Sequence, residues 1–432
     1  MTPWLKNRVW LSEEIEPQNR QDGQWICLRF IMVDSAAAID TIDPWLCSQK
    51  FFHGYLAREE LPSLLMIHGD FLIRCNEVEA GQPKELVVSV LNDPDGKYRT
   101  LSYENKLEAT RNIIIQSAIA NKEKKYFVDS REKFPSVEQL IKYYKNNPII
   151  INQTELRLTR AIRLAKWEYP STSIQVGDSI TSRASVEIKQ GKLTKYNGTV
   201  VDVAIKMIKN KSDISKQQVR DMVKEARLLR NLDHPNIIRF YGVCLLEQPI
   251  YILFELLAEG PLDVYLAKNK EKISGTERLE MVMNIAWGLE YLHSREILHR
   301  DIATKNCFYS DAKIVKISEF TLCRQGVSYS MKTARKMDIK RMAPESIKTF
   351  VFTQKSDVYT YGIFIYEVFS STEPYEKLNV IAARNSILNG TLNEFPDSTP
   401  KQLVEYVKKN MWDTNPEKRL DMQEVCHSIE FR

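Results

Sequence analysis

The segment HRDIATKN, residues 299–306, decides the fold of this 432-residue chain. It has the form H-R-D-x-x-x-x-N, with an acid and an amide five residues apart. The carboxylate of Asp301 suits a base that accepts the proton of an attacking hydroxyl group. The amide of Asn306 suits a metal ion held on nucleotide phosphates. The segment therefore predicts a loop built for proton and metal chemistry.

Further motifs surround this loop in a fixed order. Upstream, Val203-Ala204-Ile205-Lys206 ends on a strand lysine, and Glu225 lies in a helical segment, Val219–Leu229, from which it can pair with that lysine. Downstream stand MAPE at 342–345, SDVY at 356–359 and then Arg419. The whole series resembles the protein-kinase fold, which implies a β-rich small lobe and a helical large lobe.

This resemblance implies ATP and Mg²⁺ as cofactors and a protein as substrate. Its catalytic positions fall on Asp301 as base, on Lys206 and Glu225 as phosphate-positioning groups, and on Lys305 and Asn306. The metal ligands would be Asn306 and Glu319. The nucleotide would contact Ile180, Ile188, Ala204, Lys206, Glu255 and Phe308.

The catalytic loop also indicates the acceptor. Serine/threonine kinases usually place Lys two residues after the Asp, where this chain has Ala303, and Ala303-Thr304-Lys305 is close to the Ala-Ala-Arg of tyrosine kinases. Tyr329 stands where an activation-loop phosphosite would lie. An exposed loop tyrosine without that role is the alternative interpretation.

Several departures from the kinase pattern fall on chemistry. Thr181, Arg183 and Val186 replace the three glycines that let a backbone approach the phosphates. The metal-binding Asp-Phe-Gly reads Glu319-Phe320-Thr321. The extra methylene displaces a carboxylate by about 1 Å, which can cost on the order of 10²-fold in rate.

Other departures concern the walls of the two substrate sites. Asp338 and Arg341 stand where tyrosine kinases have Pro and Trp in the docking segment. Phe254 aligns with the gatekeeper, and Phe308 stands where a smaller apolar residue usually meets the adenine. These bulky residues predict reduced room for a nucleotide.

An arginine ends an apolar strand in the middle of the chain, in Phe71-Leu72-Ile73-Arg74. FHGYLAR at 52–58 precedes it, and Phe134-Pro135-Ser136 leads into a helix whose N-cap is Ser136. Together these segments resemble a Src-homology-2 (SH2) domain. The resemblance implies phosphotyrosine binding by Arg74, Arg58 and Asn76, because a guanidinium group pairs with a phosphate in a bidentate manner.

The SH2 resemblance is also incomplete. Asn112 aligns where the family usually has His, and Glu77 and Glu79 follow the arginine, where they would oppose an anion. A packing module without ligand is therefore the alternative to a phosphotyrosine reader.

These observations predict an α+β protein in four parts: an unassigned segment 1–44, an SH2 domain at 45–163, a linker at 164–173 and a kinase domain at 174–432. The SH2 domain would be a central antiparallel sheet between two helices. This order of domains resembles the Fes/Fer group of non-receptor tyrosine kinases.

Composition narrows the location and the partners. The formal net charge is +5, with both signs interspersed, so nothing points to nucleic acid. No apolar run approaches the ~20 residues of a transmembrane helix. The seven scattered cysteines suit reduced thiols. We expect a cytoplasmic protein that reaches membranes, if at all, through phosphotyrosine-containing partners.

Two hypotheses remain from the sequence. The first is a non-receptor tyrosine kinase, with activity impaired by the altered motifs. The second is an SH2-linked pseudokinase adaptor, in which Lys206 and Glu225 serve only as a structural ion pair.

Overall fold

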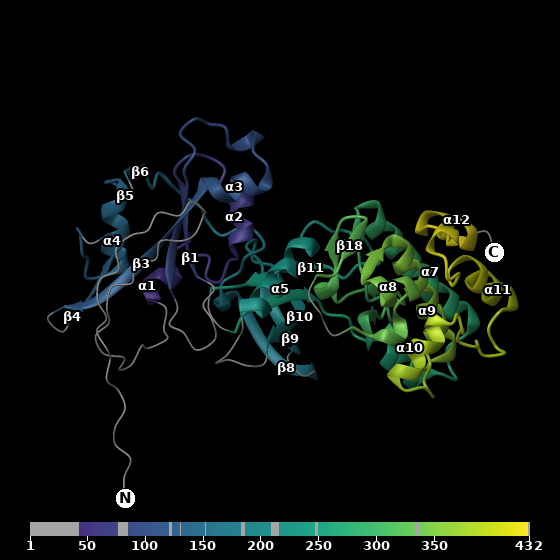
Figure 1. The fold of residues 1–432 in the computed structure, drawn as a ribbon. Coiled ribbons are helices and arrows are strands. Elements are labelled where there is room, and N and C mark those ends of the chain that lie inside the picture. The colour runs from purple at the N-terminus through teal and green to yellow at the C-terminus, as the bar shows by residue number, and fades with distance from the viewer. Residues whose placement is uncertain are drawn as a thin grey trace, which may run out of the picture. The chain divides into compact units, whose positions relative to one another are not determined.

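The computed structural model describes residues 43–432 except 77–84, 121–122, 130, 152, 183–185, 209–215, 247–248, 333–336 and 431–432. The described residues belong to one compact unit, Thr41–Arg432. We call residues 45–163 the first block and residues 174–432 the second block (Figure 1). In the described part of the chain, every helix is too short or too polar to cross a membrane.

A five-stranded sheet in the order β4-β3-β2-β1-β7 forms the core of the first block. Its strands are β1 (Asp70–Cys75), β2 (Leu86–Leu91), β3 (Thr110–Ala120), β4 (Glu123–Phe127) and β7 (Arg160–Ala161). The pairs β1–β2, β2–β3 and β3–β4 are antiparallel, whereas β1–β7 is parallel. All six residues of β1 are buried, including the charged Asp70 and Arg74 that flank its apolar centre, Phe71–Ile73.

Four short helices accompany this sheet: α1 (Pro44–Ser48), α2 (Leu61–Leu64), α3 (Tyr103–Ala109) and α4 (Val137–Tyr144), with the hairpin β5 (Ile149–Ile151) and β6 (Thr154–Leu156) after them. Helix α4 begins as predicted, because the Ser136 side chain accepts a hydrogen bond from the Gln139 amide. Its residues Val137, Leu140, Ile141 and Tyr144 are buried at helical spacing.

Sequence reasoning missed helix α3. It lies in the polar stretch between Asn92 and Thr110, where Ser102 caps it through the Asn105 amide. The signal was the Ser102 N-cap followed by Glu104 in the first turn.

The second block begins with a five-stranded sheet in the order β11-β12-β10-β9-β8 and one long helix. The strands are β8 (Ile174–Ser182), β9 (Val186–Thr194), β10 (Val200–Ile208), β11 (Phe240–Cys244) and β12 (Tyr251–Glu255), and the helix is α5 (Lys216–Leu229). Lys206 on β10 lies opposite Ile188 on β9 and Ile252 on β12, so the central strand of the lobe carries it.

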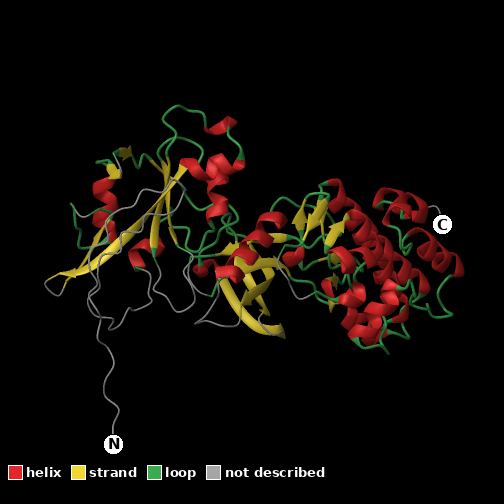
Figure 2. Ribbon diagram, in the orientation of Figure 1, coloured by secondary structure: helices red, strands yellow, loops and turns green. Residues whose placement is uncertain are grey.

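The remainder of the second block is mainly helical (Figure 2). Its helices are α6 (Leu262–Asn269), α7 (Gly275–Ser294), α8 (Pro344–Thr349), α9 (Gln354–Ser370), α10 (Val380–Leu388), α11 (Lys401–Asn410) and α12 (Met422–Glu430). Short strands join them: β13 (Gly260–Pro261), β14 (Ile297–Leu298), β15 (Cys307–Tyr309), β16 (Val315–Ile317), β17 (Arg324–Gln325), β18 (Ser328–Ser330) and β19 (Val351–Thr353).

Helix α9 lies at the centre of this lobe. It is buried along almost its whole length, including the polar residues Asp357 and Glu367. A capping box between Thr353 and Ser356 fixes its start. Trp412 packs so closely on Gly362 that a Cβ there would lie 2.5 Å from the indole nitrogen. A buried helix with buried carboxylates must satisfy them internally, which makes α9 an anchor for neighbouring loops.

The segment between the blocks joins the second sheet. Tyr169 donates its amide to the Val243 carbonyl, and Val243 donates to the Trp167 carbonyl, both at 2.8 Å. The Glu168 carboxylate turns inward and meets Nδ1 of buried His53 at 2.9 Å. Burial disfavours a charged imidazole, but the Glu168 carboxylate outweighs it and raises the pKa of His53.

The first block contacts the second block directly. Tyr55 donates its amide to the Leu245 carbonyl at 2.8 Å, and a Cβ at Gly54, whose φ is +52°, would lie 2.0 Å from that same oxygen. Glu60, 1% exposed, forms ion pairs with Arg227 and Arg230, the first on α5 and the second just beyond it. The contact therefore depends on one buried carboxylate and two cations.

We predict that Glu60→Gln lowers the free energy of unfolding by about 1.5–3 kcal/mol, because it removes charge-assisted hydrogen bonds from a buried acceptor. Urea titration followed by tryptophan fluorescence measures this change. Glu104→Gln is the matched control, since Glu104 is exposed on α3. Equal unfolding curves for the two variants would show that the ion pairs contribute nothing.

Candidate active site and phosphate-binding site

The catalytic loop is held on helix α9. The Asp357 carboxylate accepts the backbone N–H groups of His299 and Arg300, each at 2.8 Å. Arg300 has a φ of 72°, a left-handed conformation that disfavours a side chain. The His299 ring reaches the Ser318 carbonyl at 3.0 Å, so the loop is also tied to the segment that carries Glu319. These bonds set the position of the following residues.

Asp301 and Asn306 lie together, as the motif predicted. The Asn306 side-chain amide donates to the Asp301 carbonyl at 2.8 Å, which leaves its amide oxygen as the group for a metal ion. Within the described ranges, no side chain forms a hydrogen bond with the Asp301 carboxylate. Asp301 can therefore accept a proton from an incoming hydroxyl.

Lys206 is surrounded by two carboxylates. Its ammonium group lies 2.9 Å from Glu225 Oε2 and 2.7 Å from Glu319 Oε1. Lys206 is 6% exposed and Glu225 is 2% exposed. The pair between Lys206 and Glu225 predicted from the sequence therefore forms, and Glu319 joins it.

Thr321 links the two carboxylates, a role that sequence reasoning missed. Its hydroxyl lies 2.7 Å from Glu319 Oε1 and 3.0 Å from Glu225 Oε2, and it can donate to only one of them at a time. Glycine at this position could form neither contact. Glu319 itself has a φ of 61°, so the segment is held in a strained conformation by these bonds.

The electrostatics follow from burial and opposite charge. Burial alone would lower the pKa of Lys206, but Glu225 and Glu319 outweigh it and raise that pKa. Burial raises the pKa of Glu225, because Lys206 opposes that effect only in part and Glu319 adds a like charge. Lys206 thus stays charged, and its charge is shared between two acids.

All the residues predicted to contact a nucleotide line one cavity. It has a volume of about 40 Å³ and is bordered by Ile180, Ile188, Ala204, Lys206, Glu255 and Phe308, with Phe254 and Glu319 also in its wall. Ligand sites usually measure ~300–1,000 Å³. The cavity is therefore closed down in this arrangement. Thr181 lines it, whereas Arg183 lies outside the described residues.

The predicted phosphate site in the first block is built around Arg74. This side chain is 4% exposed, and its guanidinium donates to the Ser89 hydroxyl and to the side-chain amide oxygen of Asn112, both at 3.1 Å. Ser89 in turn donates to Asn112 at 2.7 Å. Ser89, which sequence reasoning missed, lies opposite Asn112 on adjacent strands, and this register orients the arginine.

The other two predicted residues are placed differently. Arg58 donates to the Leu107 carbonyl of α3 at 3.3 Å. The Asn76 amide donates to the Glu85 carboxylate at 2.9 Å, so that bond would have to exchange for one to a phosphate. Glu77 and Glu79 lie outside the described residues.

Comparisons with known proteins agree with this geometry. Residues 174–429 match the family described as protein tyrosine and serine/threonine kinase, and residues 51–144 match the SH2 domain. The chain belongs to the protein tyrosine and serine/threonine kinase family. The predicted α+β architecture, an SH2 domain followed by a bilobal kinase domain, is confirmed.

Individual relatives place it with the Fes/Fer type. The chain is 30% identical over 396 residues to the tyrosine-protein kinase transforming protein Fps of avian sarcoma virus (strain PRCII), covering 90% of this chain and 69% of that protein. It is 31% identical to the spermatocyte protein spe-8 of Caenorhabditis elegans, over 76% of this chain and 60% of that protein. It is 28% identical to human tyrosine-protein kinase Fer, over 88% of this chain and 43% of Fer.

The kinase fold implies ATP and Mg²⁺, and the site contains the types of side chain that bind these two ligands. Glu319 and Asn306 offer the carboxylate and amide oxygens that Mg²⁺ prefers, and the ammonium group of Lys206 suits a phosphate. In the described ranges, no three His, Cys, Asp or Glu side chains gather into a metal cluster.

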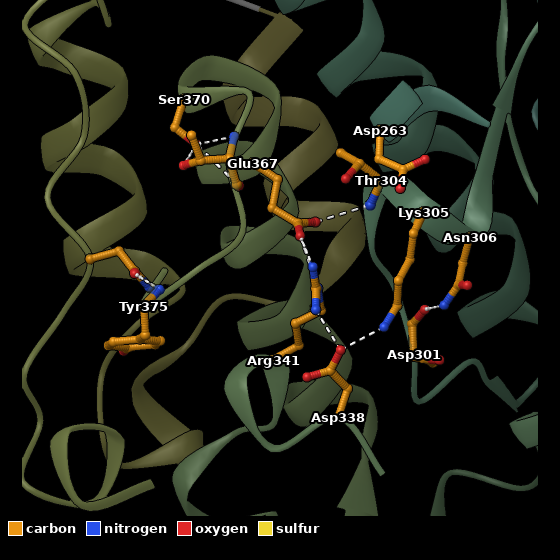
Figure 3. Close-up of polar contacts among 12 residues, drawn as sticks. Asp263, Asp301, Thr304, Lys305, Asn306, Asp338, Arg341, Glu367, Ser370 and Tyr375 are labelled. Atoms are coloured by element: carbon orange, nitrogen blue, oxygen red, sulfur yellow. Dashed lines mark hydrogen bonds and ion pairs between the residues drawn. The ribbon is translucent and has the colours of Figure 1, made fainter. Parts of the chain in front are cut away.

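The docking segment of this kinase carries an ionic network in place of apolar side chains (Figure 3). The Glu367 carboxylate accepts the Thr304 amide at 3.0 Å and the Arg341 Nε at 2.8 Å. Arg341 also pairs with Asp338, whose carboxylate lies 2.5 Å from the Lys305 ammonium group. Although burial favours the neutral acid, Arg341 and Lys305 lower the pKa of Asp338. Lys305 is therefore bound to Asp338.

Tyr329 lies beside two arginines. It is half-buried in β18, and the guanidinium carbons of Arg300 and Arg324 lie 4.5 and 5.1 Å from its ring centroid. Burial and the neighbouring charge of Arg324 lower the pKa of Arg300 to about 10. A phosphate on this tyrosine would relieve the repulsion between the two arginines.

We predict that Glu319→Asp raises the rate of tyrosine-peptide phosphorylation by up to ~10²-fold, because the shorter acid restores metal geometry and releases Lys206. The measurement is the initial rate at several Mg²⁺ concentrations, with Thr321→Gly added in a second variant. If neither variant exceeds the parent, the Glu319–Lys206 contact is not what limits the reaction.

We predict that Arg74→Ala weakens phosphotyrosine-peptide binding by ~2–5 kcal/mol, since a charged, hydrogen-bonded partner is removed. Fluorescence polarisation with a labelled phosphopeptide and its unphosphorylated form measures the difference. Arg111→Ala, on the exposed face of β3, is the control. Equal affinity in the Arg74 variant and the parent would refute this site.

Proposed function

We propose that this chain transfers the γ-phosphoryl group of ATP to protein tyrosine, slowly, and that its SH2 domain brings it to phosphotyrosine-containing proteins. The observation that carries the proposal is the set Lys206–Glu225, Asp301 and Asn306, which has the types and contacts that phosphoryl transfer requires. The substrates and the partners are part of this proposal.

The roles of the residues follow from their positions. Asp301 accepts the proton of the tyrosine hydroxyl, and Lys206, oriented by Glu225, binds phosphate oxygens. Glu319 and Asn306 would hold the metal ion, which would neutralise part of the phosphate charge. Before Lys206 binds phosphate oxygens, Glu319 has to move away from it. The Glu319 carboxylate now lies 2.7 Å from the Lys206 ammonium group. That exchange is a reason for a slow reaction.

The decisive test is phosphorylation of a tyrosine peptide by the purified chain with ATP and Mg²⁺. We predict that Asp301→Asn lowers the rate by ~10²–10⁴-fold, the range for loss of a general base. Asp311→Asn, an exposed acid in the same segment, is the matched control. A parent rate no higher than that of Asp301→Asn would reject the kinase proposal.

One observation favours the adaptor as a second candidate. The nucleotide cavity measures only about 40 Å³, and the chain's own Glu319 side chain forms part of its wall. If the kinase fold is only a scaffold, Asp301→Asn will restore function in cells that lack the protein, and Arg74→Ala will not. Failure of Asp301→Asn at normal protein levels would exclude the adaptor.

We also propose a cytoplasmic location, with membranes reached through phosphotyrosine partners. In the described part of the chain the cysteines Cys47, Cys75, Cys244, Cys307, Cys323 and Cys426 form no disulfide. Reduced thiols are typical of the cytoplasm.

A further inference from the structure

A second cavity, far larger than the nucleotide cavity, lies where the linker meets both domains. Its volume is about 930 Å³. It is lined by Cys47–Lys50, by Arg163, Leu164, Lys166 and Tyr169–Thr172, by Lys195–Asn197 and by Leu246. We call it the junction pocket. Its volume falls at the upper end of the range for ligand sites, which often occur where domains meet. None of its residues belongs to the nucleotide cavity or the Arg74 site.

The charged side chains that line the junction pocket are all positive. Lys50, Arg163, Lys166 and Lys195 line it, and no Asp or Glu does. The Lys195 ammonium group lies 4.6 Å from the Tyr241 ring centroid. For the other three, no salt bridge to another residue of the described ranges is found. The pocket therefore attracts an anion.

The acidic residue of the linker, Glu168, does not oppose that charge. Glu168 belongs to the linker, but its carboxylate is buried, where it meets His53 and accepts the Ala165 amide at 2.9 Å. The carboxylate is thus neutralised inside the protein. The cations of the junction pocket are left without a counter-charge from this segment.

An aromatic ring gives the junction pocket a flat wall. Tyr196 lines the pocket and is 59% exposed. Its ring stacks on that of Tyr169, which also lines the pocket, with ring centroids 4.9 Å apart and planes inclined by 16°. Its hydroxyl also donates to the Glu168 carbonyl, so the ring is held in place. A fixed ring with an exposed face suits stacking by a planar base.

We propose that the junction pocket binds a nucleoside triphosphate, with its base on Tyr196 and its phosphates among Lys50, Arg163, Lys166 and Lys195. Size and charge favour this ligand over a phosphotyrosine side chain. The latter carries roughly two negative charges, which four cations exceed, and it would fill little of the cavity. A triphosphate with its base and ribose matches the cations, the ring and the volume.

Cys47 offers a readout confined to this pocket. Its half-buried side chain lines the cavity, and it takes part in no disulfide. The experiment measures the rate at which a small maleimide labels Cys47 in the full chain, by mass spectrometry of its peptide. ATP is added with EDTA, so that metal-dependent binding at the kinase site is suppressed. We expect ATP to slow the labelling of Cys47.

Two variants test the assignment. The triple variant Lys50→Gln, Arg163→Gln, Lys166→Gln should need about tenfold more ATP for the same protection, as expected for the loss of three exposed charge contacts. Tyr196→Ser should also need more ATP than the parent for the same protection. The control Lys268→Gln, Lys272→Gln, Lys401→Gln removes equal charge from exposed sites elsewhere and should behave as the parent. Thermal melting checks that each variant is folded.

Three results would overturn the proposal. The first is no protection by ATP, or equal protection in the pocket and control variants. The second is protection by tripolyphosphate as strong as that by ATP, because the pocket would then bind any polyanion. The third is stronger protection by a phosphotyrosine peptide in Arg74→Ala protein, which would make the pocket a second peptide site. Nucleotide binding in the junction pocket does not depend on kinase activity, so these results test it separately from the proposed function.

Discussion

The Asp357 carboxylate is the constraint on which the catalytic centre depends. It lies inside helix α9, 1% exposed, and accepts two backbone N–H groups of the catalytic loop. A buried carboxylate without such donors would cost several kcal/mol, so the helix and the loop stabilise each other. The strained φ of Arg300 is tolerated because these bonds over-determine it. Asp301 and Asn306 inherit their positions from this anchor.

The same principle recurs at each functional junction of the chain. Glu60 joins the SH2 domain to α5, Glu168 joins the linker to His53, and Glu367 joins α9 to the docking segment. Each acid is buried and each has its own cation or N–H donors. Removing one partner of such a group leaves an uncompensated charge, so these contacts set geometry more firmly than exposed ion pairs do.

Competition for Lys206 decides what the kinase centre can do. Glu225 orients the lysine, while Glu319 occupies the place on it that phosphate oxygens would take. Thr321 holds both carboxylates, and its β-branched side chain replaces the glycine that lets the segment turn. The departures at 319 and 321 therefore act as one unit. Lys305 is engaged in a similar way, because Asp338 of the docking segment binds its ammonium group.

The sequence by itself determined the α+β fold, the order of an SH2 domain before a kinase domain, and the Fes/Fer family. It could do so because motifs such as HRDIATKN combine fixed residue types with fixed local spacing. The roles assigned to individual site residues, and the domain limits, stay predictions. Helix α3 was not predicted, because its sequence signal is confined to the N-cap and first turn. The surrounding stretch is polar, so hydrophobic periodicity is weak there.

Only the tertiary structure decided which side chains contact one another. Thr321 meets Glu225 across 96 positions of sequence, Ser89 meets Asn112 through strand register, and Lys50 and Tyr196 line one cavity from different domains. Local spacing carries no information about such meetings, because they depend on packing between elements far apart in the chain. Glu319 was expected to hold a metal ion, and it lies on Lys206 because a desolvated ammonium group binds the nearest available carboxylate.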